Sequence, residues 1–165
     1  MQVRGSSFSK AIPVCPRDPG QRLHRHGGYE RYADCDSEKR LRIPRFRCPR
    51  CGLTFSMLPS EKLPYIAPPA SQLQENFDAV ASGTDPPPLT ERARGCLRRA
   101  WKRLAARVTP LCAMFGQLIS TIKPNTGELW MQMRQHDDLE GILRFLADHF
   151  KSSLLADYLC LRLSV

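Results

Sequence analysis

The N-terminal third of the chain shows a strand-like alternation of polar and apolar residues. Over residues 40–47 arginines alternate with apolar side chains, and a weaker alternation runs through 23–33. A period of two is typical of a half-buried β-strand. The turn-forming cluster around Ser37 separates the two runs, so the pattern predicts an antiparallel β-hairpin. Gly27 and Gly28 predict a bend in its first strand.

Beyond residue 88 the apolar positions recur with a helical period instead. Leu97, Trp101 and Leu104 follow this spacing, and Thr90 is placed to cap the helix that carries them. Thr109-Pro110 marks the start of a second helix, because proline is favoured at the first helical position. The helix from Pro110 is predicted to reach Ile122, Thr126 is placed to cap a third helix, and a fourth covers 139–150 with an apolar continuation through 154–159.

The segment between these two patterns differs in composition. Residues 67–88 hold five prolines and three acids but neither lysine nor arginine, which predicts a Pro-rich acidic linker with a short amphipathic helix over 71–81. The predicted fold class is α+β, a β-hairpin zinc ribbon followed by a small all-α domain. The predicted divisions are a flexible tail at 1–12, the ribbon at 13–66, the linker at 67–88 and the helical domain at 89–165.

Charge adds an expected partner to this picture. The chain has 165 residues, a net charge of +9 and a pI near 9.5. The excess charge lies in the ribbon and in the first helix after the linker, where residues 89–107 hold seven bases and one acid. Such a chain is expected to bind an acidic partner, most commonly nucleic acid. Without a signal peptide or a long apolar run, the sequence predicts a cytoplasmic protein with no membrane partner.

A metal site is predicted where the second strand of the hairpin ends. Cys48 and Cys51 are separated by two residues and followed by Gly52, the arrangement of a zinc knuckle. Cys15 precedes the partner strand and supplies a third soft ligand. The predicted cofactor is Zn²⁺, because a ribbon of about 50 residues rarely folds without a metal or a disulfide.

The fourth zinc ligand has three candidates. Asp18 follows Cys15 at the spacing of a second knuckle, although carboxylates are minority ligands in structural zinc sites. His24 and His26 are set beside Cys48 by the hairpin register. Cys35 falls near the far tip of the hairpin and is not expected to bind the metal. The other cysteines, Cys96, Cys112 and Cys160, are interpreted as small buried residues of helices.

Arginine-rich stretches predict where nucleic acid would bind. Guanidinium groups make bidentate contacts with phosphate, and these contacts carry little sequence information. The hairpin arginines are expected to line one face or rim, and a second group lies on the first helix after the linker. Tyr29, Tyr32 and Phe46 are interpreted as core residues rather than as base-stacking groups. The predicted nucleic-acid-binding residues are Arg25, Arg31, Arg42, Arg45, Arg47, Arg50, Arg98, Arg99, Lys102 and Arg103.

One family resemblance covers residues 13–66. The motifs that carry it are Cys15-Pro16, His24-Arg25-His26-Gly27 and Arg45-Phe46-Arg47-Cys48-Pro49-Arg50-Cys51-Gly52-Leu53-Thr54-Phe55. This segment resembles the N-terminal zinc ribbon of insertion-sequence transposases and of small bacterial mobile-element proteins. The resemblance implies a DNA-recognition ribbon whose four zinc cysteines occupy positions 15, 18, 48 and 51. The chain departs from that pattern at Asp18, and no transposase catalytic domain follows.

These features predict a non-enzymatic, zinc-stabilised, DNA-binding protein that acts as an accessory or a regulator of transposable elements. No phosphate loop, strand-borne carboxylate set or nucleophile–base arrangement indicates an enzyme or a small-molecule substrate. An alternative is a protein–protein adaptor whose helical half docks a transposase or another acidic protein through Trp101 or Trp130. A more distant alternative is a zinc hydrolase that uses Asp18 or His24.

Overall fold

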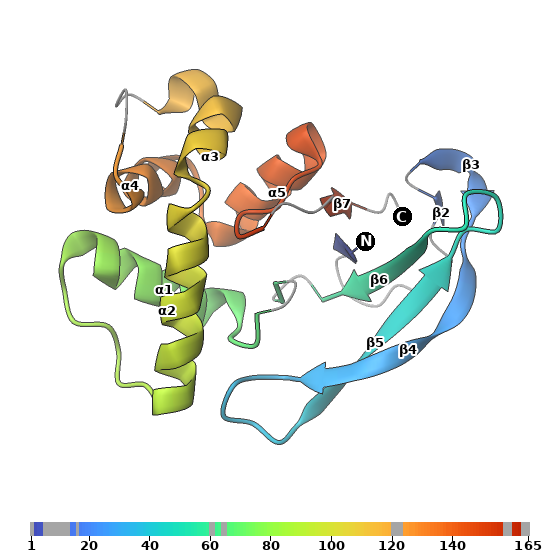
Figure 1. The fold of residues 1–165 in the computed structure, drawn as a ribbon, viewed down its shortest axis with the longest axis horizontal. Coiled ribbons are helices and arrows are strands. Elements are labelled where there is room, and N and C mark those ends of the chain that lie inside the picture. The colour runs from blue at the N-terminus through green and yellow to red at the C-terminus, as the bar shows by residue number, and fades with distance from the viewer. Residues whose placement is uncertain are drawn as a thin grey trace.

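The predicted α+β class is confirmed in a computed structural model, in which antiparallel strands precede five α-helices in the described part of the chain (Figure 1). Residues 2–4, 14–15, 17–59, 62–63, 66–119, 124–156 and 160–162 are described. A long hairpin pairs β4 (His24–Tyr32) with β5 (Arg40–Arg47), and Tyr29 faces Ile43 across it.

The predicted bend at Gly27 and Gly28 is a bulge in β4. The register shifts between Arg25 and Gly28, and Gly27 has a φ of 80°, a conformation that favours glycine. A Cβ atom on Gly28 would lie 2.9 Å from the backbone oxygen of Ile43. Both glycines are therefore required by the path of the hairpin backbone.

Short strands from both ends of the chain enlarge this sheet. The strand order is β4-β5-β6-β1-β7, where β6 is Thr54–Leu58, β1 is Gln2–Arg4 and β7 is Cys160–Arg162. β1 lies between β6 and β7 and runs parallel to both. It therefore pairs with backbone groups of β6 that would be left unpaired if β6 were an edge strand. A second sheet pairs β2 (Val14–Cys15) with β3 (Asp18–Arg22).

These end strands correct two sequence predictions. Residues 2–4 form a strand where a flexible tail was expected, whereas residues 1 and 5–12 lie outside the described residues. The second half is not purely helical, because β7 returns to the sheet. Three-residue strands are too short to show a readable alternation. Here β1 pairs with β6, and β7 pairs with β1.

The helices of the second half follow their predicted starts in part, and the helix expected from Thr109-Pro110 begins one residue earlier, after Arg107 as its cap. The helices are α1 (Ala70–Ser82), α2 (Glu91–Ala105), α3 (Val108–Phe115), α4 (Thr126–His136) and α5 (Leu139–Phe150), with a 3₁₀ turn at Gly116–Leu118. The Thr90 side chain accepts a hydrogen bond from the Ala93 backbone, as predicted. The cap of α4 is Asn125 rather than Thr126, and it forms a capping box with Glu128.

Two predicted helix ends are wrong. The helix that was expected to reach residue 122 stops at Phe115, where Gly116 adopts a φ of 53°. Helix α5 stops at Phe150 because Lys151 adopts a left-handed conformation, and Leu154 and Leu155 pack into the core without continuing the helix. Residues 120–123 and 157–159 lie outside the described part of the chain.

Helix α1 belongs to the helical core and not to a linker. Leu73 and Phe77 are fully buried, and the Phe77 ring meets that of Trp130 edge-to-face at 5.2 Å. Trp130 in turn donates a hydrogen bond to Asp78 at 2.7 Å. Within the predicted linker, residues 67–68 and 84–88 lack regular structure, and α1 lies between them. Composition misled the prediction here, because prolines flank α1 and do not interrupt it.

A core substitution tests this assignment of α1. Phe77→Ala is expected to lower the free energy of unfolding by about 3 kcal/mol, since it removes a buried ring from between Trp101 and Trp130. Val80→Ala is the matched control on the same helix, because Val80 is 42% exposed and should change stability by less than about 0.5 kcal/mol. Urea denaturation measures both. Equal small effects would mean that α1 is a loosely attached segment.

Hydrogen bonds join the hairpin to the helical half. Arg31 donates to the backbone oxygens of Leu63 and Ile66, and Lys62 donates to those of Ala33 and Ala67. The hydroxyl of Thr90 also lies 2.6 Å from a carboxylate oxygen of Asp36. The loop of the hairpin therefore sits against the first turn of α2 (Figure 1).

Candidate metal centre and basic surface

The predicted knuckle is a tight turn between β5 and β6. The backbone N–H of Gly52 donates to the oxygen of Cys48 at 3.0 Å, and that of Cys48 donates to Leu53 at 2.9 Å. Gly52 has a φ of 70°, the conformation for which glycine was expected at this position. The Cys51 N–H points at the sulfur of Cys48, 3.4 Å away. The turn thus places the sulfurs of Cys48 and Cys51 within 4.8 Å of each other.

Cys15 completes a group of three sulfurs. It lies on β2, and its Sγ is 3.8 Å from that of Cys51, while the sulfurs of Cys15, Cys48 and Cys51 all lie within 4.8 Å of one another. Two ligands of a tetrahedral zinc with Zn–S bonds of about 2.3 Å would be about 3.8 Å apart. The three cysteines can therefore hold a metal ion, and their softness and spacing fit zinc.

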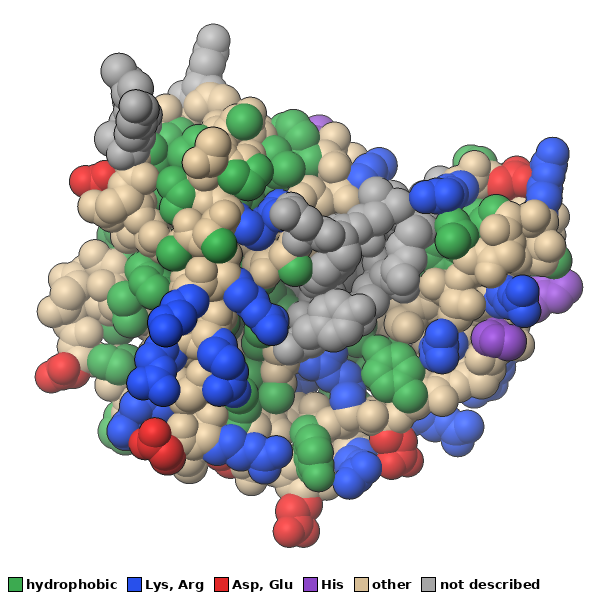
Figure 2. Space-filling view, in the orientation of Figure 1, with side chains coloured by type: hydrophobic (Ala, Val, Ile, Leu, Met, Phe, Trp, Pro, Cys, Tyr) green, Lys and Arg blue, Asp and Glu red, His purple; other side chains and the backbone are tan. Residues whose placement is uncertain are grey.

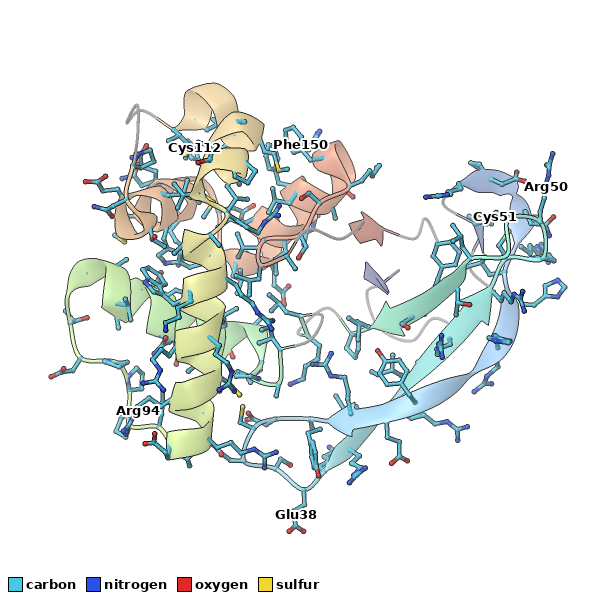
Figure 3. The ribbon with its side chains drawn as sticks, viewed as in Figure 1. Glu38, Arg50, Cys51, Arg94, Cys112 and Phe150 are labelled. Carbon is cyan, nitrogen blue, oxygen red and sulfur yellow. The ribbon has the colours of Figure 1, made fainter. Side chains whose placement is uncertain are left out.

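The environment shifts the pKa values of Cys15 and Cys48 in opposite directions. Burial raises the pKa of Cys15. The backbone N–H of Cys51 lowers the pKa of Cys48, since a hydrogen bond from the N–H stabilises the thiolate. Cys51 is exposed, at the end of the hairpin remote from the helices (Figure 3). Of the two buried sulfurs, Cys48 is therefore the one whose thiolate form this turn favours.

None of the candidate fourth ligands joins the sulfur group. Asp18 lies beside the knuckle, but its carboxylate pairs with Arg50 at 2.8 Å. The hairpin register pairs His24 with Arg47, next to Cys48, and both His24 and His26 are exposed to solvent. Among the residues that the structure describes, the group spaced for a metal contains three cysteines and no carboxylate or imidazole. Three ligands are thus assembled where four were predicted.

Substitutions at the metal centre test this ligand set. Asp18→Ala and His24→Ala are each expected to weaken zinc binding by at most about 10- to 100-fold, the effect of an outer-shell group rather than a ligand. Competition with a chromophoric chelator measures the affinity. A loss of about 1,000-fold in either variant would identify that residue as the fourth ligand. If that residue is Asp18, its pair with Arg50 would have to break.

The densest basic surface lies on α2. Figure 2 shows lysine and arginine side chains along this helix, and Arg98, Arg99, Lys102 and Arg103 are all exposed. The single acid of the helix, Glu91, pairs with Arg94 at 3.2 Å. The opposite face is apolar, with Ala93, Leu97, Ala100 and Leu104 buried in the core. Within the described residues, no acid pairs with Arg98, Lys102 or Arg103.

The hairpin arginines do not share one face as predicted. Side chains alternate along a strand, so Arg40 and Arg42 lie on one face of β5 whereas Arg45 and Arg47 lie on the other. Arg25, Arg42, Arg45 and Arg47 are exposed. Arg31 instead uses its guanidinium to join the hairpin to residues 63 and 66, so it is a structural residue. Arg50 is exposed but paired with Asp18.

The ring of Tyr32 contacts arginines of both the hairpin and α2. The guanidinium of Arg40, its partner across the hairpin, lies 4.9 Å from the ring centroid, and that of Arg92 on α2 lies 5.4 Å from it. These cation–π contacts place the hairpin beside the N-terminal part of α2. Phe46 packs on the cluster that contains Cys15, Cys48 and Phe55, as predicted for a core residue.

The sequence did not identify the environment of two further cysteines. Cys35, expected at a remote tip, is buried in the β4–β5 loop, and Cys96 of α2 is among the groups that raise its pKa. Cys96 is only half-buried, and its sulfur lies 3.2 Å from a guanidinium nitrogen of Arg99. Contacts between residues 61 positions apart leave no local signal, although the docked loop brings them together.

The chain matches no family model, no curated protein and no solved structure. The motif resemblance to transposase zinc ribbons therefore stays a prediction. None of the described helices has both the length and the apolar character needed to cross a bilayer.

Proposed function

We propose that the protein binds nucleic acid through the basic surface of α2 and the exposed arginines of the hairpin. The observation that carries this proposal is the imbalance of charge on α2, where four exposed bases in residues 98–103 face solvent without an acid on the same surface. A helix face that served only for solubility would carry mixed charges. Unneutralised bases gain most from phosphate, which releases counterions when it binds.

The spacing on α2 suits contact with a phosphate backbone. Arg98 and Lys102 are four residues apart, as are Arg99 and Arg103, so the two pairs form adjacent rows on the helix surface. The apolar face of α2 is held by the helical core, which keeps these rows directed outward. Contacts of this kind give affinity and orientation with little dependence on base sequence. The proposed ligand is duplex DNA, as the ribbon motif suggests.

The proposed metal is zinc, and its role is structural. It would hold Cys15 and the β2–β3 sheet against the knuckle, which fixes the end of the hairpin that carries Arg25, Arg45 and Arg47. The finer proposal, an accessory or regulatory protein of bacterial transposable elements, is supported by the Cys-x-x-Cys-Gly-x-Thr-Phe motif at 48–55. An adaptor that docks partners through Trp101 or Trp130 has less support, because Trp130 is fully buried and Trp101 is partly buried against the same core.

Fluorescence anisotropy with the zinc-loaded chain tests the proposal. Labelled duplex and single-stranded DNA are titrated across a series of salt concentrations. We expect binding whose log K falls with log salt at a slope of about −3 or steeper, as for a protein that neutralises several phosphates. No binding at low salt, or an affinity that does not depend on salt, would contradict it.

A further inference from the structure

The contact between the β4–β5 loop and α2 brings a second pair of cysteines together. Cys35 is 2% exposed, and two nearby residues of the hairpin interact with the start of the helix. Asp36 is bonded to Thr90, one residue before α2, and Tyr32 contacts Arg92 on its first turn. Cys96 lies one turn further along the same helix. Cys96 is among the groups that raise the pKa of the Cys35 thiol, so the two thiols are neighbours within this contact.

We propose that Cys35 and Cys96 are a redox-active pair that forms a disulfide between the hairpin loop and α2. The oxidant is a low-molecular-weight disulfide of the glutathione type. Neither cysteine belongs to the metal centre, whose sulfurs come from Cys15, Cys48 and Cys51. The disulfide would fasten the hairpin to the helix that carries the basic surface. This inference concerns a modification site and does not depend on the proposed function.

The surroundings of the two sulfurs assign their order of reaction. Burial raises the pKa of Cys35 to about 12, and its hydrogen bond to Cys96 and the charges of Asp34 and Asp36 act in the same direction. Cys35 is therefore a protonated thiol at neutral pH. Cys96 is half-buried and accessible to solvent, and Arg99 offers its sulfur a charged donor at 3.2 Å. Cys96 is the sulfur that meets the oxidant first, because it is accessible to solvent whereas Cys35 is buried.

The reaction balances in two exchanges. The Cys96 thiolate attacks one sulfur of the oxidant, which forms a mixed disulfide and releases the first small thiolate. Cys35 then attacks the Cys96 sulfur and expels the second small thiolate, while the protons of the two protein thiols pass to the two small thiols. Overall, two protein thiols are oxidised to one disulfide, and one small disulfide is reduced to two thiols.

Peptide mapping of the full zinc-loaded chain tests the proposal. The chain is incubated with oxidised glutathione, blocked with an alkylating reagent and digested with trypsin without reduction. Cys35 then lies in the peptide 32–39 and Cys96 in the peptide 95–98, because Arg31, Lys39, Arg94 and Arg98 are the flanking cleavage sites. We expect these two peptides joined by a disulfide, with the intact chain lighter by two hydrogens.

Two single variants control the experiment. Cys112→Ser removes a cysteine on α3 whose pKa burial also raises, and it should leave the 35–96 cross-link unchanged. Cys96→Ser should leave Cys35 as a free thiol, and its thermal midpoint, compared with that of the wild type, verifies that the fold is retained. Glutathione retained on Cys96, a cross-link between other cysteines, or free thiols at both positions after oxidation would each overturn the proposal.

Discussion

Cys48→Ser is expected to unfold the knuckle end of the hairpin while the helical half stays folded. Cys48 is fully buried, and the backbone N–H of Cys51, 3.4 Å from its sulfur, lowers its pKa. Small metal-dependent units owe most of their folding free energy to the metal, so loss of one of three sulfurs is expected to remove zinc at ordinary concentrations. Limited proteolysis should then cleave within 17–28 and 44–56 and spare α1 to α5.

A matched serine substitution separates the metal from the loss of a thiol. Cys112→Ser also replaces a cysteine that is at least partly buried, but on α3 and far from the knuckle, and it should leave the protease pattern unchanged. Hydrogen exchange gives an independent reading of the same two regions. If the Cys48→Ser chain resists protease at the knuckle as well as the wild type does, the metal site proposed here is wrong.

The double variant Arg98→Ala and Lys102→Ala is expected to make DNA binding less dependent on salt. Both side chains are exposed on α2, and neither is paired with an acid among the described residues. Removing two phosphate contacts should reduce the slope of log K against log salt by about 1.8. Anisotropy titrations at several salt concentrations measure this slope directly.

The control removes two positive charges elsewhere on the helical half. Arg144 lies on α5 and Lys151 follows it, and both are exposed. Arg144→Ala with Lys151→Ala lowers the net charge equally, but these residues lie outside the proposed surface. The slope should therefore stay within experimental error of the wild type. Equal changes in both double variants would mean that net charge, and not the α2 surface, governs binding.

Local patterns were sufficient to predict the hairpin and most helix boundaries. The alternation over 40–47 and the turn near Ser37 gave the correct pairing of β4 with β5, and the glycine pair at 27–28 marked the bulge. Thr90 correctly marked the start of α2. These signals are legible because each depends on residues close together in the chain.

Long-range packing could not be predicted in the same way. Strand β1 forms only because β6 and β7 come to lie beside it, and nothing in three residues records that pairing. Helix α1 was taken for part of a linker because its flanks are rich in proline, although Leu73 and Phe77 are central to the core. The Cys35–Cys96 contact was missed for the same reason.

The candidate site was predicted in part. The three cysteines are brought together as expected, since the knuckle spacing and the hairpin register fix them. The sequence left three candidates for the fourth ligand. Asp18 has the spacing from Cys15 that a second knuckle would have, but its carboxylate is paired with Arg50. Arg31 was wrongly assigned to nucleic-acid binding, because a sequence does not show which guanidinium groups the backbone oxygens of a neighbouring segment will occupy.

The measurement that tests the central claim most directly is DNA binding by the zinc-loaded chain before and after treatment with a chelator, at two salt concentrations. The account predicts salt-sensitive binding that weakens by about tenfold or more on chelation and returns when zinc is restored, because the hairpin arginines need the metal-held knuckle to keep their positions. Binding that is equally strong and equally salt-sensitive without metal would contradict the link between the metal centre and the basic surface.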